Sequence, residues 1–350
     1  MQFSSDAIIN LLKSSVYLPL ADNPSLLREV ALEICTNSGT IVIDEIQKLP
    51  ALLDEIHDLI ETEDIRFILT GSSGRKLKRS GVNLLAGRAW EANLFPLTTM
   101  EIPDFNINRY LLYGGLPQVY GSEYPAEELD AYINTYLKEE IKEEALVQNF
   151  THFARFLRIA AISNGEQLNY ANISRDTGIP ATSVRSYFEI LSDTFIGFLV
   201  EPWKESKKRK AIATSKFYLF DVGVANFIQG ITALGRNSSE FGTAFEHFIA
   251  MELRSYISYR RIKKNLTYWR TKTGIEVDFL VGTEAAIEVK SGSRVSDRHL
   301  KGLRALAEEG IITSLFFISF DELDRRTDDG IRVLHWRTFL QEMWADSFSW

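Results

Sequence analysis

Two acids and a lysine near the C-terminus have a spacing that suits metal-dependent phosphate chemistry. They are Asp278, Glu288 and Lys290, and they lie in the run GIEVDFLVGTEAAIEVKSG. If residues 282–284 form a three-residue hairpin loop, Asp278 falls opposite Glu288, with Cβ atoms roughly 5 Å apart. Lys290 shares that face because side chains alternate along a strand. At an effective dielectric constant of about 20 the two carboxylates repel by about 3 kcal/mol, which favours a bound cation.

The cation expected at this pair is Mg²⁺, for which two carboxylates plus waters are a usual protein contribution. Lys290 would offset the charge that develops on a scissile phosphate, and Glu246, in the helical run GTAFEHFIAMEL, is a further carboxylate for the same site. The alternative is a surface hairpin with a lysine to glutamate pair. Because the acids lie within apolar runs, we favour the metal-site interpretation over the surface hairpin. Asp278 and Glu288 are then the candidate metal ligands, and Glu246 and Lys290 are further candidate catalytic residues of a phosphodiesterase.

A second acid pair, Asp44 and Glu45, ends the apolar run of IVIDEIQKLP. At the carboxyl end of a parallel strand, Asp44 would hold Mg²⁺ with its water and Glu45 would polarise an attacking water. The next strand ends in Thr70 and Ser72, whose hydroxyls are candidates to contact a γ-phosphate, and Arg88 is a candidate trigger arginine. The alternatives are ordinary acids at a strand end and a surface arginine in a salt bridge.

The 350 residues contain no phosphate-binding loop of the form GxxxxGK[ST]. The glycine-rich, basic run GSSGRKLKRS lacks the spacing and the strand-to-helix order of such a loop. Two acids and a hydroxyl alone offer little to hold a triphosphate. We therefore do not expect this chain by itself to hydrolyse ATP.

Residues 151–203 predict three short helices, a tight turn GIP before the third, and a closing strand, which is the winged form of a helix-turn-helix. Ser183 and Arg185 begin the third helix, where base contacts would be made. The run KESKKRK follows as a linker or wing tip. Its candidate DNA-contacting residues are Lys207, Lys208, Arg209 and Lys210. The alternatives are a protein-binding winged helix and a solvated charge run.

Composition limits the class of protein. The formal charge is -8, so any contact with nucleic acid must be local. Cys35 is the single cysteine, which excludes an intrachain disulfide framework and a cysteine-rich zinc site. No basic leader or long apolar run occurs, so we expect a soluble cytoplasmic protein with no membrane partner.

The order of predicted strands and helices that would position these residues indicates an α/β protein. Two apolar runs around an amphipathic helix at 51–60 indicate parallel strands, and runs at 16–20 and 90–95 would bring that sheet to about four strands. The last part alternates a helix at 241–256, a strand at 266–269, a hairpin at 275–290, a helix at 297–309 and a strand at 311–319. The predicted divisions are 1–105 (α/β), 106–150 (helical), 151–203 (winged helix) and 204–350 (second α/β).

Taken together, the motifs resemble a known family. They are IVIDEIQKLP, FILTGSS, LLAGR, YLLYGGLPQVY, KFYLFDVGVANFI, GTAFEHF, EVDFLV and IEVKS. In this order they look like prokaryotic AAA+ superfamily ATPases that carry a C-terminal domain of unknown function with a PD-(D/E)XK, restriction-endonuclease-like core. The resemblance covers nearly the entire chain. It implies a P-loop NTPase-type parallel sheet, then a winged helix, then a nuclease-like α/β domain, with ATP and Mg²⁺ as cofactors.

By that resemblance Asp44 and Glu45 match the Walker B acids, residues 70–73 match the sensor strand, and Arg88 matches the basic residue after the glycine. A further set matches the nuclease-like signature: Glu246, Asp278, Glu288 and Lys290. Family members open with a GPRQVGKTT-like Walker A segment, which would lie upstream of Met1. Its strand usually lies beside the sensor strand, so residues 65–70 should have either an unpaired edge or a rearranged neighbour.

Three functions remain open from the sequence. The first is a DNA-associated AAA+ type ATPase whose nucleotide module is incomplete as given. The second is a Mg²⁺-dependent nuclease, and the third is a non-catalytic module that binds DNA or a protein through the winged helix. The oligomeric state is not determined by any of these patterns.

Overall fold

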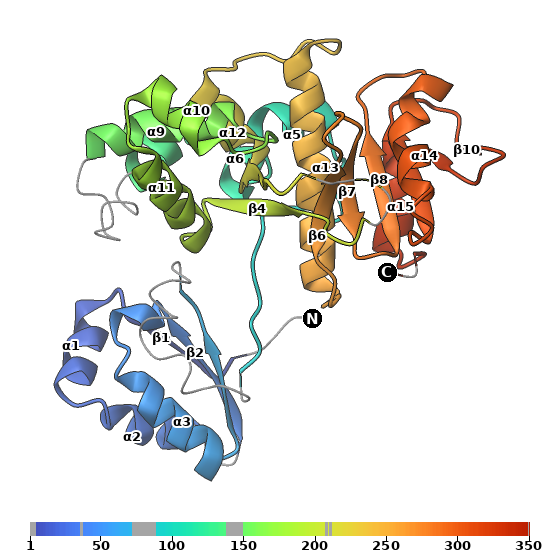
Figure 1. The fold of residues 1–350 in the computed structure, drawn as a ribbon. Helices are drawn as coiled ribbons and strands as arrows, with labels where there is room; N and C mark the ends of the chain where they lie inside the picture. Colours follow the sequence, from blue (N-terminus) through green and yellow to red (C-terminus); the bar gives the residue numbers. More distant parts are fainter. Residues whose placement is uncertain are drawn as a thin grey trace. The chain divides into compact units, whose positions relative to one another are not determined.

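The computed structural model describes residues 5–35, 38–71, 89–137, 150–206, 209, 212–348 and 350. The chain forms two compact units (Figure 1). Unit 1 is built from residues up to 91, and unit 2 from nearly all of the remainder. No helix in the described ranges is long and apolar enough to cross a membrane.

Unit 1 contains a parallel sheet with the spatial order β1-β2-β3. Its strands are β1 (Ala7–Asn10), β2 (Gly39–Asp44) and β3 (Ile65–Leu69). Its helices are α1 (Ser14–Asp22), α2 (Leu26–Ile34), the 3₁₀ turn η1 (Ile46–Lys48) and α3 (Leu52–Thr62). Ile41 and Ile43 of β2 share a core with Leu52 and Ile56 of α3. The predicted parallel strand, helix, strand unit is confirmed.

Two other predictions for this sheet are wrong. Residues 16–20 lie in α1, and residues 90–95 belong to no strand. The third strand is instead β1, which pairs in parallel with β2 and therefore needs a crossover connection, and residues 14–34 supply it as α1 and α2. The described sheet thus has three strands rather than about four. As expected, β3 lies at its edge.

Unit 2 is built on a mixed sheet with the order β10-β11-β9-β8-β7-β6-β4-β5. Its strands are β4 (Gly197–Pro202), β5 (Lys216–Leu219), β6 (Leu266–Arg270), β7 (Glu276–Val281), β8 (Ala285–Val289), β9 (Ser314–Ser319), β10 (Arg325–Arg326) and β11 (Arg332–His335). Parallel sheet and mixed sheet together confirm the α/β class.

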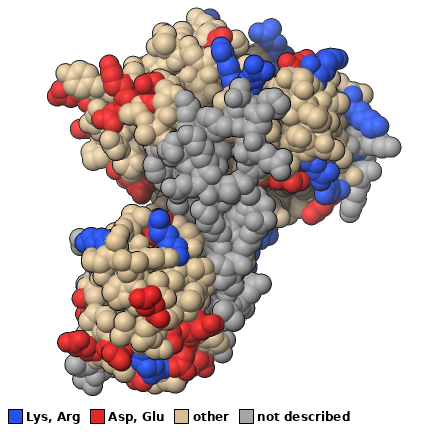
Figure 2. All heavy atoms as spheres, turned by 90° about the vertical axis from the view of Figure 1, so that its left-hand side faces the viewer, with Lys and Arg blue, Asp and Glu red and all other residues tan. Residues whose placement is uncertain are grey.

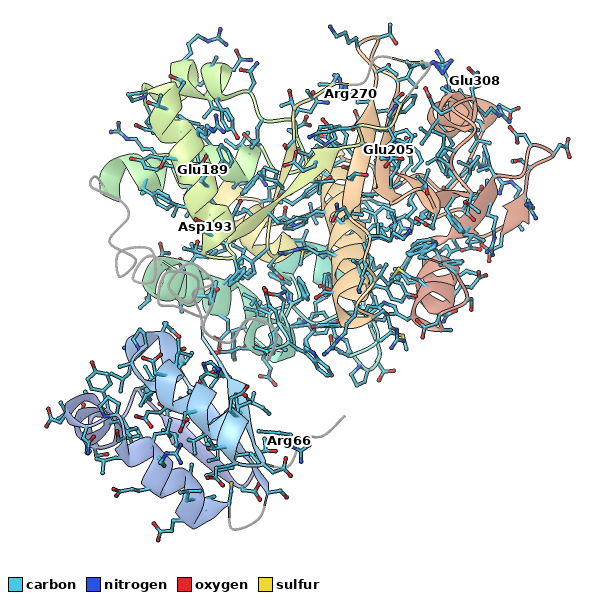
Figure 3. The ribbon with its side chains drawn as sticks, turned by 60° about the horizontal axis from the view of Figure 1, so that its bottom comes forward. Arg66, Glu189, Asp193, Glu205, Arg270 and Glu308 are labelled. Carbon is cyan, nitrogen blue, oxygen red and sulfur yellow. The ribbon has the colours of Figure 1, made fainter. Side chains whose placement is uncertain are left out.

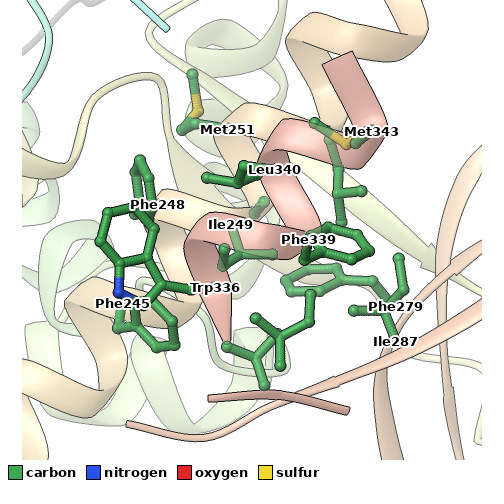
Figure 4. Close-up of a cluster of buried hydrophobic side chains, with 14 of the residues drawn as sticks. Phe245, Phe248, Ile249, Met251, Phe279, Ile287, Trp336, Phe339, Leu340 and Met343 are labelled. Atoms are coloured by element: carbon green, nitrogen blue, oxygen red, sulfur yellow. The ribbon is translucent and has the colours of Figure 1, made fainter. Parts of the chain in front are cut away.

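Helices cover both faces of this sheet. On one face α13 (Ser239–Tyr259) and α15 (Trp336–Trp344) pack against Phe279 and Ile287 (Figure 4). On the other face η4 (Asp297–Leu300) and α14 (Lys301–Ala307) pack against Leu280 and Ala286. Strands in this position read as continuous apolar runs because both faces are buried, so a charged residue within them must be accounted for.

The helical part of unit 2 contains α5 (Ile107–Tyr113), α6 (Pro117–Gly121), α7 (Pro125–Ala131), the π-helix η3 (Tyr132–Leu137), α9 (Phe150–Ile162), α10 (Tyr170–Thr177), α11 (Ala181–Asp193) and α12 (Val222–Gln229). The three helices expected before a closing strand are α9, α10 and α11, followed by β4. β4 pairs antiparallel with β5, so the basic run lies between two paired strands. The three predicted divisions beyond residue 105 fall in this one unit, and their boundaries stay a prediction.

Candidate active site

The hairpin β7–β8 places Asp278 and Glu288 opposite each other. Phe279 pairs with Ile287 and Val281 with Ala285, and residues 282–284 form the loop between the strands. Extending this register by one position brings Asp278 to Glu288. The register predicted from the sequence is confirmed. Both acids are buried, with 4% and 7% of their surfaces exposed.

Lys290 joins the two acids. Its Nζ lies 3.3 Å from Asp278 Oδ2 and 2.8 Å from Glu288 Oε1, while about half of its side-chain surface stays exposed. The backbone N–H of Val289 also donates to Asp278 Oδ2, at 2.8 Å. The ammonium group of Lys290 can therefore contact a ligand from solvent while it holds both carboxylates. The face predicted for Lys290 is confirmed.

Of Asp278, Glu288 and Lys290, Glu288 has a buried oxygen atom without a hydrogen-bond donor in the described part of the chain. Its Oε2 is buried and accepts no hydrogen bond from any described residue. Burial, with the nearby charge of Asp278, raises the pKa of Glu288 to about 8, although Lys290 opposes that shift. The carboxylate repulsion expected from the sequence thus acts mainly on Glu288. A buried carboxylate oxygen without a donor is the kind of atom that a cation satisfies.

Glu246 is held beside this pair by two residues that the sequence did not single out. Lys216 Nζ lies 3.2 Å from Glu246 Oε1, and Tyr218 donates its hydroxyl to the same oxygen at 2.7 Å. Lys216 also lies 2.5 Å from Glu276 Oε1. Burial raises the pKa of Glu246, Lys216 opposes this, and Asp278 adds to it. The sequence signal for these two residues was the strand KFYL, in which a lysine and a tyrosine alternate with apolar residues. All four residues of this strand are buried.

The lysine Lys216 itself is buried and charged. Burial alone would lower its pKa, but the surrounding groups, Glu246 first, raise its pKa well above the usual value. Its ammonium also lies 5.3 Å from the ring centroid of Tyr268. We call Lys216, Glu246, Glu276, Asp278, Glu288 and Lys290 the acid–lysine cluster.

A divalent cation fits the part of the acid–lysine cluster that contains Asp278 and Glu288. Among the residues that the structure describes, no three His, Cys, Asp or Glu side chains are grouped as metal ligands. Asp278 and Glu288 supply two carboxylates, the number that Mg²⁺ commonly takes when waters complete its shell. The unsatisfied Oε2 of Glu288 supports this fit. Glu246 is instead neutralised by Lys216.

The predicted site in unit 1 brings three residues together. Thr70 Oγ1 donates to Asp44 Oδ1 at 2.5 Å, and the backbone N–H of Glu45 donates to Thr70 Oγ1 at 3.4 Å. Glu45 has φ = 64°, a left-handed conformation that is uncommon for a residue with a side chain and is concentrated at functional sites. Ser72 and Arg88 lie outside the described residues.

The predicted DNA-contacting arginines are both engaged by acids. Arg185, on α11 with Ser183, pairs with Glu189 at 3.2 Å, and Arg209 pairs with Glu308 at 2.7 Å. Arg209 also donates to the carbonyl oxygen of Ala305 at 2.8 Å. Figure 3 shows Glu189 and Glu308 on opposite sides of unit 2, so the two arginines belong to different surfaces.

The rest of the basic run is not placed: Lys207, Lys208 and Lys210 lie outside the described residues. On the face drawn in Figure 2, acidic and basic side chains alternate in small groups over the described surface. This face carries no broad positive field, in agreement with the formal charge of -8.

Comparison with known families covers most of the chain. Residues 3–103 match the family described as AAA domain. This part of the chain is therefore similar to AAA domains. Residues 104–235 and 241–339 match two domains of unknown function, DUF8612 and DUF4143. The AAA domain thus corresponds to the parallel sheet with Asp44, Glu45 and Thr70, and the DUF4143 domain holds Glu246, Asp278, Glu288 and Lys290 of the acid–lysine cluster.

Two similar curated proteins are described as uncharacterized. Rv2008c of Mycobacterium tuberculosis is 27% identical over 290 residues, covering 79% of this chain and 65% of that protein. MJ1544 of Methanocaldococcus jannaschii is 24% identical over 310 residues, covering 80% and 65%. This chain therefore spans about 65% of the length of these relatives. Can2 of Sulfobacillus thermosulfidooxidans, solved with cyclic tetra-adenylate, aligns over 97% of this chain and 98% of its own at 12% identity, with a TM-score of 0.25.

Proposed function

We propose that the DUF4143 part of this AAA-type protein is a Mg²⁺-dependent phosphodiesterase that acts on DNA. The observation that carries the proposal is the buried pair Asp278 and Glu288, joined by the exposed ammonium of Lys290 and left with one unsatisfied oxygen on Glu288. Cleavage of a phosphodiester needs a cation at the phosphate and a way to balance the charge that develops there. This cluster offers both.

Each residue has a distinct part in this proposal. Asp278 and Glu288 would hold Mg²⁺, which supplies electrostatic stabilisation of the phosphate when bound. The Lys290 ammonium would donate a hydrogen bond to a phosphate oxygen. Glu246, fixed by Lys216 and Tyr218, would orient water or the ion's water shell at the edge of the site. Lys216 would keep Glu246 ionised by pairing with it.

Plasmid nicking with and without Mg²⁺ tests this activity. The wild-type chain should nick supercoiled DNA with Mg²⁺ and lose this activity in EDTA. Asp278→Asn and Lys290→Met should each lose at least 100-fold. Glu284→Gln is the matched control, because Glu284 is an acid of the same hairpin that pairs with Lys264 at 2.5 Å outside the proposed site. Equal nicking by the two site variants and the wild type would assign the activity to a contaminant.

The match to the AAA domain family suggests an AAA-like ATPase. In such a site Asp44 would hold Mg²⁺, Glu45 would polarise the attacking water and Thr70 would contact the γ-phosphate. Because the 350 residues hold no GxxxxGK[ST] loop, ATP hydrolysis is not proposed for this chain alone. Equilibrium dialysis with Mg²⁺ and labelled ATP tests this: saturable binding that is lost in Asp44→Asn would show a nucleotide site of another kind.

A second candidate function is binding through α9, α10 and α11. β4 and β5 pair antiparallel after these helices, and Asn164, between α9 and α10, forms an isolated bridge with Phe217 of β5. This arrangement favours a winged helix that binds DNA or a protein. Binding should persist in EDTA, and a steep loss with salt would identify DNA as the partner. If the chain does not bind DNA above 50 mM salt, DNA is excluded as the partner, and the proposal is then that these helices bind a protein.

A further inference from the structure

A basic pocket lies in unit 2 away from the acid–lysine cluster. Its volume is about 410 Å³. It is lined by Ile107 of α5, the loop residue Arg236, Phe320 and Glu322 after β9, and the end of β11 with the first turn of α15. The residues from the last segment are His335, Trp336, Arg337 and Thr338. None of these residues belongs to the cluster described above.

The two arginines of this pocket stack on aromatic rings. The guanidinium carbon of Arg236 lies 4.1 Å from the ring centroid of Phe320 and 5.6 Å from that of Phe241. That of Arg337 lies 5.1 Å from the ring centroid of Trp336. Stacking uses the face of the guanidinium and leaves the N–H groups in its plane available.

Neither guanidinium makes an ion pair or side-chain hydrogen bond with a residue in the described part of the chain. Several other arginines in the described part of unit 2 have carboxylate partners. Among them are Arg209 with Glu308, Arg260 with Asp346, Arg270 with Glu276, Arg304 with Asp329, Arg325 with Asp321 and Arg332 with Glu342. Arg260 and Arg332 also lie over aromatic rings, so Arg236 and Arg337 differ from these paired arginines in having no carboxylate of a described residue on their N–H groups.

The pocket is lined by apolar side chains and by charged side chains. Ile107, Phe320 and Trp336 are buried apolar side chains, and Figure 4 shows Trp336, the first residue of α15, in the buried hydrophobic cluster. Glu322 is the one carboxylate in the lining, against two guanidiniums. A ligand that fits this arrangement carries an oxyanion for the arginines and an apolar or aromatic body for the walls.

We propose that this pocket binds a small phosphate monoester with an aromatic or apolar body. A phosphate presents several oxygens to two planar N–H forks at once, which matches guanidinium geometry better than ammonium geometry. The volume of about 410 Å³ accommodates a body larger than the phosphate itself. This site does not depend on the proposed phosphodiesterase, because the two share no residue.

Calorimetric titration of the full chain with phenyl phosphate, inorganic phosphate and phenol tests the proposal. Phenyl phosphate should bind with a stoichiometry of one and at least 10-fold more tightly than inorganic phosphate, and phenol should not bind. Arg236→Ala and Arg337→Ala should each weaken phenyl phosphate at least 10-fold. Arg236→Lys should lie between Arg236→Ala and the wild type, because it keeps the charge but loses the planar fork.

Arg298→Ala is the matched control, since Arg298 is an exposed arginine on η4 outside the pocket. It should leave the affinity unchanged. Because Arg236 and Arg337 are exposed, their variants should unfold at the wild-type temperature, which circular dichroism verifies. Absence of saturable phenyl phosphate binding, or affinities that are equal in the wild type, Arg236→Ala and Arg337→Ala, would overturn the proposal.

Discussion

Lys216 Nζ lies 3.2 Å from Glu246 Oε1, which ties an edge strand of the mixed sheet to the long helix α13. The two residues are thirty positions apart in the chain, and both contribute to the cluster around Asp278. The same ammonium contacts Glu276 of β7. One buried lysine therefore contacts carboxylates from two different elements, α13 and β7.

Replacing Lys216 should destabilise the protein strongly. Lys216→Met removes the cationic partner of Glu246 and one of the two cationic partners of Glu276, which also pairs with Arg270. Breaking a buried pair in this way costs about 3 kcal/mol of unfolding free energy. Urea unfolding measures this. Lys264→Met is the control, because the pair of Lys264 and Glu284 is more exposed and should contribute about 0–1 kcal/mol. Equal losses in the two variants would mean that Lys216 contributes no more than a surface lysine.

Binding of Mg²⁺ at Asp278 and Glu288 should release a proton. Because burial raises the pKa of Glu288 to about 8, its carboxyl group is mostly protonated at pH 7 without a cation. A metal ligand must be deprotonated, so binding at pH 7 should release a proton from the Glu288 carboxyl group. Titration calorimetry in buffers of different ionisation enthalpy counts these protons.

The control for this proton count is Glu288→Gln, which has no proton to release and one ligand fewer. It should bind Mg²⁺ more weakly and show no dependence on the buffer. Binding by the wild-type chain without proton release would contradict the assignment of Glu288 as a ligand.

Glu252 should make stability fall as the pH rises. This buried residue accepts hydrogen bonds from the Thr99 N–H at 2.7 Å and from Trp344 Nε1 at 2.7 Å. Burial raises its pKa to about 7, although these donors oppose the shift. Between the ordinary glutamate pKa and about 7 the folded chain binds more protons than the unfolded chain, so stability is lost as pH rises through this window.

The size of this effect is on the order of 3 kcal/mol of unfolding free energy between pH 4.5 and pH 8. Denaturant unfolding at several pH values measures it. Glu252→Gln removes the titrating group and should flatten this part of the profile. Parallel profiles for the wild type and Glu252→Gln would show that Glu252 does not titrate in this window.

Gly223 should not tolerate a side chain. It opens α12 against the backbone of Tyr113, and a Cβ atom there would clash with the Tyr113 carbonyl group. Backbone cannot move aside as a flexible side chain does, so Gly223→Ala should cost several kcal/mol, about 3 or more. Gly121→Ala is the control, since no atom lies within 4 Å of its added Cβ. Thermal unfolding compares the two.

Several features of the candidate site followed from the sequence because they are local. Residues 282–284 close a short hairpin, and once the loop length is known the period of two assigns Asp278, Glu288 and Lys290 to one face. Asp44 and Thr70 were likewise brought together because parallel strands end at the same edge of a sheet. The hairpin is decided by a few neighbouring residues, whereas Asp44 and Thr70 meet through the pairing of β2 with β3.

Other features depended on contacts between distant segments. Residues 16–20 have strand-forming side chains, yet they lie in α1 because the pairing of β1 with β2 requires a crossover. Arg209, in the most basic run of the chain, pairs with Glu308 of a segment about a hundred residues later. Local composition does not reveal such a partner.

The order of side chains along the chain was enough to determine the α/β class, the hairpin register and the acid pair, because strand periodicity and short loops act over a few residues. Only the tertiary structure decided that Lys216 neutralises Glu246, that the arginines of the basic run and of α11 are paired with acids, and that Arg236 and Arg337 share a pocket. The physical reason is that charge pairing and burial depend on which segments meet in space, and that choice is made by the packing of the whole sheet and its helices.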